Sequence, residues 1–251
     1  EFSETGRFAV PGDPAPSADG LTDIATLSAE ADVAPGATSE VVFVLAWHFP
    51  VRENYWNAQP GYKGKKLRNQ YALRFQGAWS VAAYTATHLK RLEQETRQFH
   101  DSFFESTLPA SVLDAASSQA SIVRTNTCMF IEGRQFFAFE GCNDNAGCCP
   151  MNCTHVWNYE QSLAHLFPEL ERSMRRTDFK KNLRPDGAMA FRTLIPLDGE
   201  LWKHAPAADG QMGCVVKAYR EWQLSGDTEW LKDLWPQIKK ALEYAWVSWD
   251  A

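Results

Sequence analysis

The chain carries one acidic residue in a setting that suits the cleavage of sugars. Glu140 ends the apolar run 136–139 and is followed by Gly141 and a loop rich in Cys, Asn and aromatic residues. A stiff hydrophobic segment can fix a carboxylate in place, a glycine leaves room for a ligand, and amides and rings can contact a sugar. A structural role stays open, because Glu140 could simply pair with an arginine such as Arg134 or Arg192.

The end of the same loop supplies candidate ligand-binding residues. His155 lies at a predicted boundary between loop and helix, where its imidazole could donate to a ligand hydroxyl or cap the helix. Asn158 offers an amide, and Trp157 offers a ring face on which the C–H bonds of a pyranose can pack. Asp209 and His204 are weaker candidates, since an N-cap explains the first and lone histidines are more often structural.

Four cysteines crowd into twelve positions beside His155: Cys142, Cys148, Cys149 and Cys153. Cysteine and histidine are zinc ligands, but the spacing is not that of a paired C-x-x-C knuckle. The adjacent Cys148 and Cys149 are not expected to point at one ion, so a disulfide or packed thiols compete with a metal. We expect no metal and no cofactor. Cys128 and Cys214 are predicted to lie in the core.

Composition bounds the class of protein. The 251 residues are 45% hydrophobic, which is enough for a substantial core, and include ten Trp, fifteen Phe and seven Tyr. A net charge of -6 without a basic stripe argues against a nucleic-acid partner. The longest apolar stretch, Val41 to Trp47, falls short of the ~20 residues that span a bilayer. Oligomeric state and compartment stay open.

The first part of the chain is predicted to be β-structure with loops. Residues 1 to about 50 carry Pro and Gly turn signals around strand-like segments at Thr22 to Leu27 and Glu40 to Trp47. The segment Asn54 to Gly64 is rich in Tyr, Trp, Pro and Gly, and is interpreted as a linker. Because the chain begins at Glu1 without an initiator Met and ends abruptly at Ala251, we expect it to be a piece of a longer protein.

After this region the hydrophobic period changes from 2 to 3.6, which predicts helices. A hairpin is expected within Ile122 to Phe139, around Glu132-Gly133-Arg134. Gly and Asp punctuate the last two helices, and Pro236 would bend or split the final one. Paired helices with short loops fit an α-toroid or a bundle. The predicted helices are Leu67 to Thr96, Leu108 to Ala120, Val156 to Leu166, Pro168 to about Asn182, Met212 to Leu224, and Asp227 through Ala245.

Four motifs in one order resemble glycoside hydrolase family 116, which includes β-glucosidases and the non-lysosomal glucosylceramidase. The similarity runs from about residue 38 to the end of the chain. The motifs are Phe139-Glu140-Gly141, the run Cys153 to Tyr159, the run Leu166 to Arg175, and the run Tyr219 to Asp227.

The resemblance implies a mainly α chain with a β N-terminal part. Residues 1–55 would be the last strands of a β-sandwich, and residues 65–251 about half of an (α/α)6 barrel. It also implies that Glu140 is the catalytic nucleophile, while the acid/base Asp has no counterpart up to Ala251. The chain departs from other branches at His155, where they place an Asp after a shorter loop.

The expected function is that of a retaining glycosidase that cleaves terminal β-glucosides, or related β-xylosides or glucosylceramide-like lipids. The partner is a small-molecule glycoside. Two other functions stay open: a non-catalytic half-barrel for binding or assembly, and a zinc enzyme that uses Cys148 or Cys149, Cys153 and His155.

Overall fold

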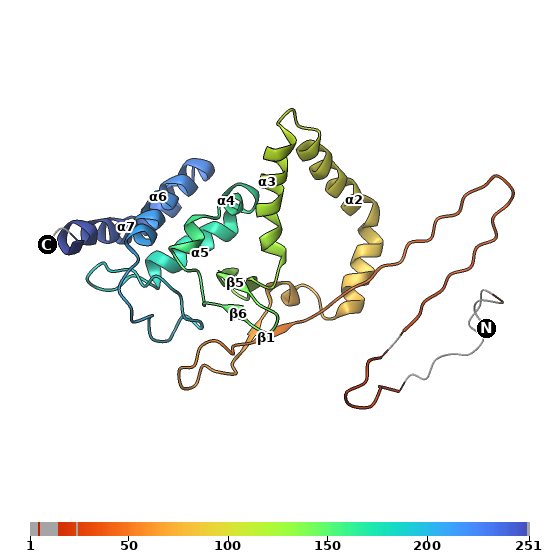
Figure 1. Ribbon diagram of the computed structural model, residues 1–251, viewed down its shortest axis with the longest axis horizontal. Coiled ribbons are helices and arrows are strands. Elements are labelled where there is room, and N and C mark those ends of the chain that lie inside the picture. The colour runs from red at the N-terminus through yellow and green to blue at the C-terminus, as the bar shows by residue number, and fades with distance from the viewer. Residues whose placement is uncertain (1–4, 6–14, 24, 250–251) are drawn as a thin grey trace. The chain divides into compact units, whose positions relative to one another are not determined.

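The computed structural model describes residues 5, 15–23 and 25–249 (Figure 1). The chain divides into two units, Glu1–Leu45 and Ala46–Ala251, and each is described by itself. Helices predominate in the second unit, beside short antiparallel strands. Within the described residues, no helix is both long and apolar enough to cross a membrane.

The two predicted N-terminal strands are wrong for the residues that the structure describes. Residues 22, 23 and 25–27 form no strand, and neither do residues 40–47. Ile24 lies outside the described residues. The apolar side chains are exposed, with Val41 at 46% and Leu45 at 82%. A strand gains its stability from a paired neighbour, and the described part of this unit gives these segments none. The predictions for residues 1–4 and 6–14 fall outside the described residues.

The first strands form a hairpin, β1 (Val51–Glu53) and β2 (Lys66–Arg68). The segment interpreted as a linker, Asn54 to Gly64, is instead part of the loop that joins these two strands. It is anchored, because the buried Asn54 and Asn57 both donate from Nδ2 to the carbonyl of Ile195, at 2.7 and 3.1 Å.

The first long helix begins later than predicted. The segment from Leu67 contains the end of β2 and the short helix η1 (Gln70–Leu73), and α2 spans Ala78–Phe104. Gly77 precedes α2 with extended backbone, and its N–H donates to Ser80 Oγ at 3.2 Å. The next helix, α3 (Ala110–Ala120), begins two residues after the predicted start at Leu108, with Pro109 at its N-cap. The short helix η2 (Ser121–Arg124) follows.

The predicted hairpin is confirmed as β3 (Cys128–Ile131) and β4 (Gln135–Ala138). Gly133 and Arg134 turn the chain with φ values of 82° and 58°. The hairpin is covered on both faces, which explains its continuous apolar sequence. One face joins a cluster with Phe136, Ala138 and Trp157, and the other joins a cluster with Phe137, Phe139 and Met151.

The predicted helix Val156 to Leu166 is broken in two. The short helix η3 (Val156–Asn158) precedes α4 (Ser162–Leu166). Glu160 causes the break, because its carboxylate accepts hydrogen bonds from the Leu163 N–H, at 3.0 and 3.2 Å, and so begins α4. Two further short strands, β5 (Gly141–Cys142) and β6 (Gly147–Cys148), form a third hairpin just after β4.

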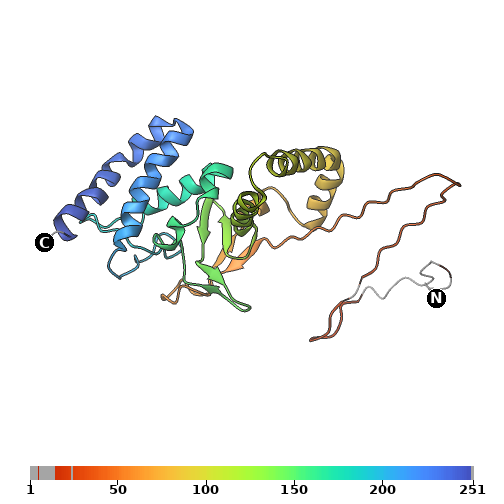
Figure 2. The same ribbon diagram turned by 45° about the horizontal axis from the view of Figure 1, so that its top comes forward.

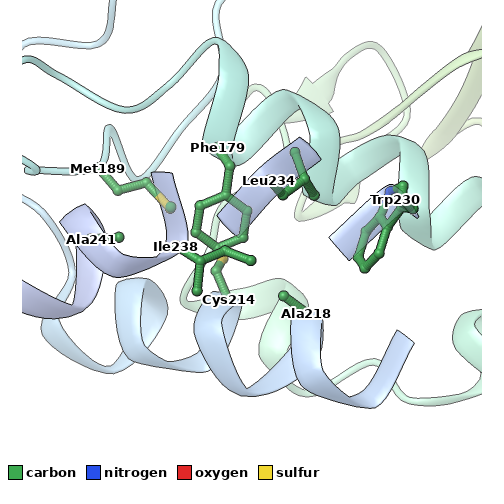
Figure 3. Close-up of a cluster of buried hydrophobic side chains, with 8 residues drawn as sticks. All are labelled: Phe179, Met189, Cys214, Ala218, Trp230, Leu234, Ile238 and Ala241. Carbon is green, nitrogen blue, oxygen red and sulfur yellow. The ribbon is translucent and has the colours of Figure 1, made fainter. Parts of the chain in front are cut away.

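The last three helices pack around one apolar cluster (Figures 2 and 3). They are α5 (Pro168–Lys180), α6 (Ala208–Ser225) and α7 (Thr228–Trp249), and the cluster contains Phe179, Cys214 and Leu234. Gly226 ends α6 in the left-handed region, with φ 67°. Asp227 caps α7 as predicted, since Trp230 N donates to its Oδ1 at 2.9 Å. Pro236 lies inside α7 without splitting it.

A buried ion network joins α5 to α6. Arg175 is fully buried, and its Nη2 lies 2.9 Å from Asp178 and 3.9 Å from Glu171. Arg220 reaches Glu171 at 3.0 Å, so the two helices share one carboxylate. Burial raises the pKa of Asp178 against the pull of Arg175. Removing one partner from such a buried group leaves the others without compensation.

We predict that Arg175→Ala lowers the free energy of unfolding by about 3–5 kcal/mol, because it leaves Asp178 and Glu171 buried with less positive charge nearby. The control is Arg91→Ala, which removes an exposed pair with Glu95 that water screens, so the loss should be far smaller. Urea unfolding of both variants measures the difference. Equal losses would contradict a structural role for the network.

Candidate active site

The backbone that leads into Glu140 is held on every side. Phe139 N donates to Thr127 O at 2.9 Å, and Trp157 Nε1 donates to Phe139 O at 3.1 Å. Asn152 satisfies both backbone polar groups of Ala138. Ala138 N donates to Asn152 Oδ1 at 2.8 Å, and Asn152 N donates to Ala138 O at 2.7 Å. These bonds fix the position of the residue that follows.

Glu140 itself is partly accessible. Its side chain is 19% exposed, and its Oε1 accepts from Arg192 Nη2 at 2.6 Å. The ion pair with Arg192, one of two arginines that the sequence offered, is therefore present. Burial opposes the charge of Arg192, but Cys149 and Glu140 together raise its pKa, so the guanidinium stays cationic.

Two adjoining cavities meet at Glu140. The larger, about 420 Å³, is also lined by Trp157, Tyr159 and Glu160. The smaller, about 340 Å³, is also lined by His155 and Arg192, together with Cys153, Val156, Phe191 and residues 205–207. A carboxylate that opens onto space for a small ligand, beside a cationic partner and aromatic rings, can act as a nucleophile or as a base.

His155 is held by its own partners. Its Nδ1 contacts Asp209 Oδ2, and its Nε2 lies 3.4 Å from the hydroxyl of Tyr159. The imidazole does not cap η3, so that alternative is wrong. Asn158 Nδ2 donates to Asp209 O at 3.0 Å, which brings three of the predicted site residues together. Asp209 is not the N-cap, because Ala207 occupies that position and Asp209 lies in the first turn of α6.

Two glycines allow α6 to approach this loop. A Cβ on Gly210 would lie 2.3 Å from Thr154 Oγ1, and one on Gly213 would lie 2.2 Å from Asn158 Nδ2. The spacing of Gly210 and Gly213 could have indicated this close approach from the sequence, but the motifs considered above do not include these glycines. Small residues one helical turn apart mark a face where backbone comes close.

The other two candidates lie apart from this group. Trp157 is buried, at 5% exposure, and serves chiefly to hold Phe139 O, although its edge lines the larger cavity. His204 is exposed and stacks near Trp202, with ring centroids 5.2 Å apart. Arg192 lies beneath the same aromatic group, 5.6 Å from the centre of the Trp202 ring. Sequence reasoning gave neither Arg192 nor Trp202 a place at a site.

The cysteines correct one expectation. All six are free thiols in the described chain, so the disulfide alternative is not observed. Cys148 and Cys149 do converge, with their Sγ atoms 3.2 Å apart, because Cys149 adopts φ 57°. The zinc set that the sequence offered is not assembled, since His155 faces Asp209 while Glu140, Cys148 and Cys149 form the group.

Comparison with known proteins finds one family model that matches part of the chain. Residues 1–92 match the family model described as beta-glucosidase 2, glycosyl-hydrolase family 116 N-term. The match supports a place for the chain among the glycoside hydrolases. Within that class it confirms the resemblance to family 116, although it lies before Glu140 and the four motifs. No curated protein matches the chain.

We predict that Trp157→Phe lowers the free energy of unfolding by about 1–3 kcal/mol, because Phe139 O loses its donor while staying buried. The matched control is Trp222→Phe, whose Nε1 donates to Thr228 Oγ1 at 3.4 Å in a partly exposed position and should cost less. Chemical denaturation compares the two. A larger loss at Trp222 would contradict the proposed hold on Phe139.

Alkylation should also separate the cysteines. Burial raises the pKa of Cys128 and of Cys214 to about 12, so at pH 8 only a trace of either is thiolate. The exposed Cys142 should react first with iodoacetamide, and the two buried thiols should react only after denaturation. Peptide mass spectrometry of a time course tests this order, and rapid native labelling of Cys214 would refute it.

Proposed function

We propose that the protein is a retaining glycoside hydrolase that cleaves terminal β-glucosides through a covalent glycosyl-enzyme at Glu140. Related β-xylosides and glucosylceramide-like lipids belong to the same proposed substrate class. The observation that carries the proposal is the placement of Glu140, whose carboxylate ends a clamped strand and lines two cavities beside Arg192. The match to family 116 supports the same class of reaction.

In this mechanism a Glu140 oxygen attacks the anomeric carbon as the bond to the leaving oxygen breaks. A carboxylic acid about 5–5.5 Å from the nucleophile protonates that leaving oxygen and then takes a proton from the attacking water. The family resemblance assigns this second role to an Asp that has no counterpart up to Ala251. We therefore propose that the 251 residues alone do not turn over substrate.

Glu160 also lines the larger cavity, but its carboxylate is engaged elsewhere. It accepts hydrogen bonds from the Leu163 N–H and the Ser162 hydroxyl, which begin α4. A carboxylate oxygen that already accepts from two donors in the first turn of a helix is poorly placed to shuttle protons. The second catalytic carboxylate is therefore not assigned to Glu160.

The residues around Glu140 suit the recognition of a pyranose. His155 lines the smaller cavity with Glu140 and would contact a sugar hydroxyl, while Asn158 and Asp209, which line neither cavity, would support it from behind through their mutual contacts. Trp157 would contribute a ring edge, and His204 would contribute from the aromatic group near Arg192. The proposal places these residues on the inner loops of an (α/α)6 barrel, of which residues 65–251 would form about half, after a β-sandwich that ends near residue 55.

Arg192 has a positioning role in this proposal. Its guanidinium holds Glu140 Oε1 and packs over Phe191, 5.2 Å from the ring centre. A planar, permanently charged group held in this way orients a carboxylate better than a lysine does. A purely structural glutamate would make the same ion pair with Arg192. Kinetic measurements on a Glu140 variant distinguish a structural role from that of a nucleophile.

We predict that Glu140→Ala in the complete protein lowers kcat on an aryl β-glucoside by about 10⁴-fold or more, because the covalent intermediate cannot form. Added azide should restore part of the rate by attacking the anomeric carbon in place of the carboxylate. The rescued product should be the α-glucosyl azide, which proton NMR identifies by its anomeric signal.

The matched control is Asp144→Asn, which removes a carboxylate from the same loop that lines a separate cavity without Glu140. Its kcat should stay within about tenfold of the parent, as expected for a group outside the reaction. A Glu140→Ala variant that keeps comparable activity, or that forms β-glucosyl azide, would refute the nucleophile. A stable but inactive variant without azide rescue would favour a structural glutamate.

A further inference from the structure

The loop after Glu140 brings three possible metal ligands together. A carboxylate oxygen of Glu140 and the Sγ atoms of Cys148 and Cys149 all lie within 4.8 Å of one another. The two sulfur atoms are 3.2 Å apart. Neighbouring cysteines in a regular strand point to opposite sides, so this convergence needs a special backbone.

The backbone supplies that arrangement. β5 and β6 pair Gly141 with Cys148, and Glu140 N donates to Cys148 O at 3.0 Å, which sets Glu140 directly beside Cys148. Cys149 then takes φ 57°, a conformation that L-residues other than Asn and Asp rarely adopt. This turn brings its thiol back to the side of its neighbour. The hairpin and the turn therefore hold the three groups together before any ligand arrives.

We propose that Glu140, Cys148 and Cys149 form a site for a borderline-soft divalent cation such as Zn²⁺. Two thiolates and one carboxylate belong to the ligand set of zinc, and three protein ligands leave a fourth position for water. Hard cations such as Mg²⁺ and Ca²⁺ prefer oxygen ligands and are disfavoured by the two sulfurs. Binding releases the thiol protons to solvent.

The cation would compete with Arg192. In the structure the guanidinium is the positive partner of Glu140, with its Nη2 2.6 Å from Oε1. A divalent ion on the same carboxylate repels the guanidinium and so weakens its hold on Glu140. The site is thus a second use of the same side chain, distinct from the reaction.

The consequence is inhibition by thiophilic metals. A Glu140 oxygen bound to the ion cannot attack an anomeric carbon, so occupancy and turnover exclude each other. This consequence rests on the proposed function. The binding itself does not, because it depends only on the three side chains and the backbone that holds them.

Titration of the 251-residue chain with Cd²⁺ tests the binding directly, in a phosphine reductant that keeps the thiols free. One ion per chain should bind and produce the ultraviolet charge-transfer band of cadmium thiolate. Cys148→Ser and Cys149→Ser should each weaken binding on the order of 100-fold or more, since loss of an outer partner alone costs about 10–100-fold. Glu140→Gln should weaken it while keeping the band.

The matched control is Cys142→Ser, which removes an exposed thiol from the same hairpin that lies outside the group. It should bind Cd²⁺ like the parent, and circular dichroism should show that every variant is folded. Unchanged binding in Cys148→Ser and Cys149→Ser, or loss of binding in Cys142→Ser, would overturn the site. The Cys148→Ser and Cys149→Ser variants of the complete protein should also resist inhibition by Zn²⁺.

The two proposals fail separately. Cd²⁺ binding that depends on Cys148 and Cys149, without any inhibition by Zn²⁺ at saturating occupancy, would uphold the metal site and contradict the role of Glu140 as nucleophile. Azide rescue of Glu140→Ala together with cysteine-independent Cd²⁺ binding would uphold the nucleophile and overturn the metal site.

Discussion

The site depends on one constraint, which is that the buried backbone polar groups before Glu140 must all be satisfied. Asn152 pairs with Ala138 in the manner of a neighbouring strand, and Trp157 Nε1 supplies the donor for Phe139 O. An unsatisfied buried carbonyl would cost about 1–3 kcal/mol, so these partners have little freedom to move. Apolar clusters cover both faces of the hairpin, and the carboxylate of Glu140 follows directly after it and lines a cavity.

Trp157, which holds Phe139, is itself held by a residue of α6. Lys217 Nζ donates to Trp157 O at 3.1 Å, and burial lowers the pKa of this lysine. Lys217 lies on α6, the helix whose residues Arg220 and Glu221 extend the ion network around Arg175. Two of the four motifs that resemble family 116, the runs Leu166 to Arg175 and Tyr219 to Asp227, therefore supply the buried charged residues between α5 and α6. The other two supply Glu140 and the residues that line the cavities. The resemblance carries information about stability as well as chemistry.

Local patterns predicted the chain well from α3 onward and poorly before α2. The β3–β4 hairpin, α3, α5 and the Asp227 cap follow from turn chemistry and helix periodicity, which act over a few residues. The segment 40–47 has the composition of a strand but no partner strand among the described residues, and pairing is a property that no local pattern contains. The same limit left the choice between Arg134 and Arg192 open, because Arg192 meets Glu140 across 52 positions of sequence. It also hid the convergence of Cys148 and Cys149, because only the backbone angle at Cys149 creates it.

The claim that the structure builds a nucleophile at position 140 is tested most directly by covalent trapping. The complete protein is incubated with an activated 2-deoxy-2-fluoro-β-glucoside, which slows breakdown of the glycosyl-enzyme, and is then digested and mapped by mass spectrometry. The account predicts one sugar per chain, attached by an ester to Glu140 in the peptide that contains Phe139-Glu140-Gly141. A label on any other carboxylate, or hydrolysis of the reagent without a trapped sugar and with inversion at the anomeric carbon, would contradict it.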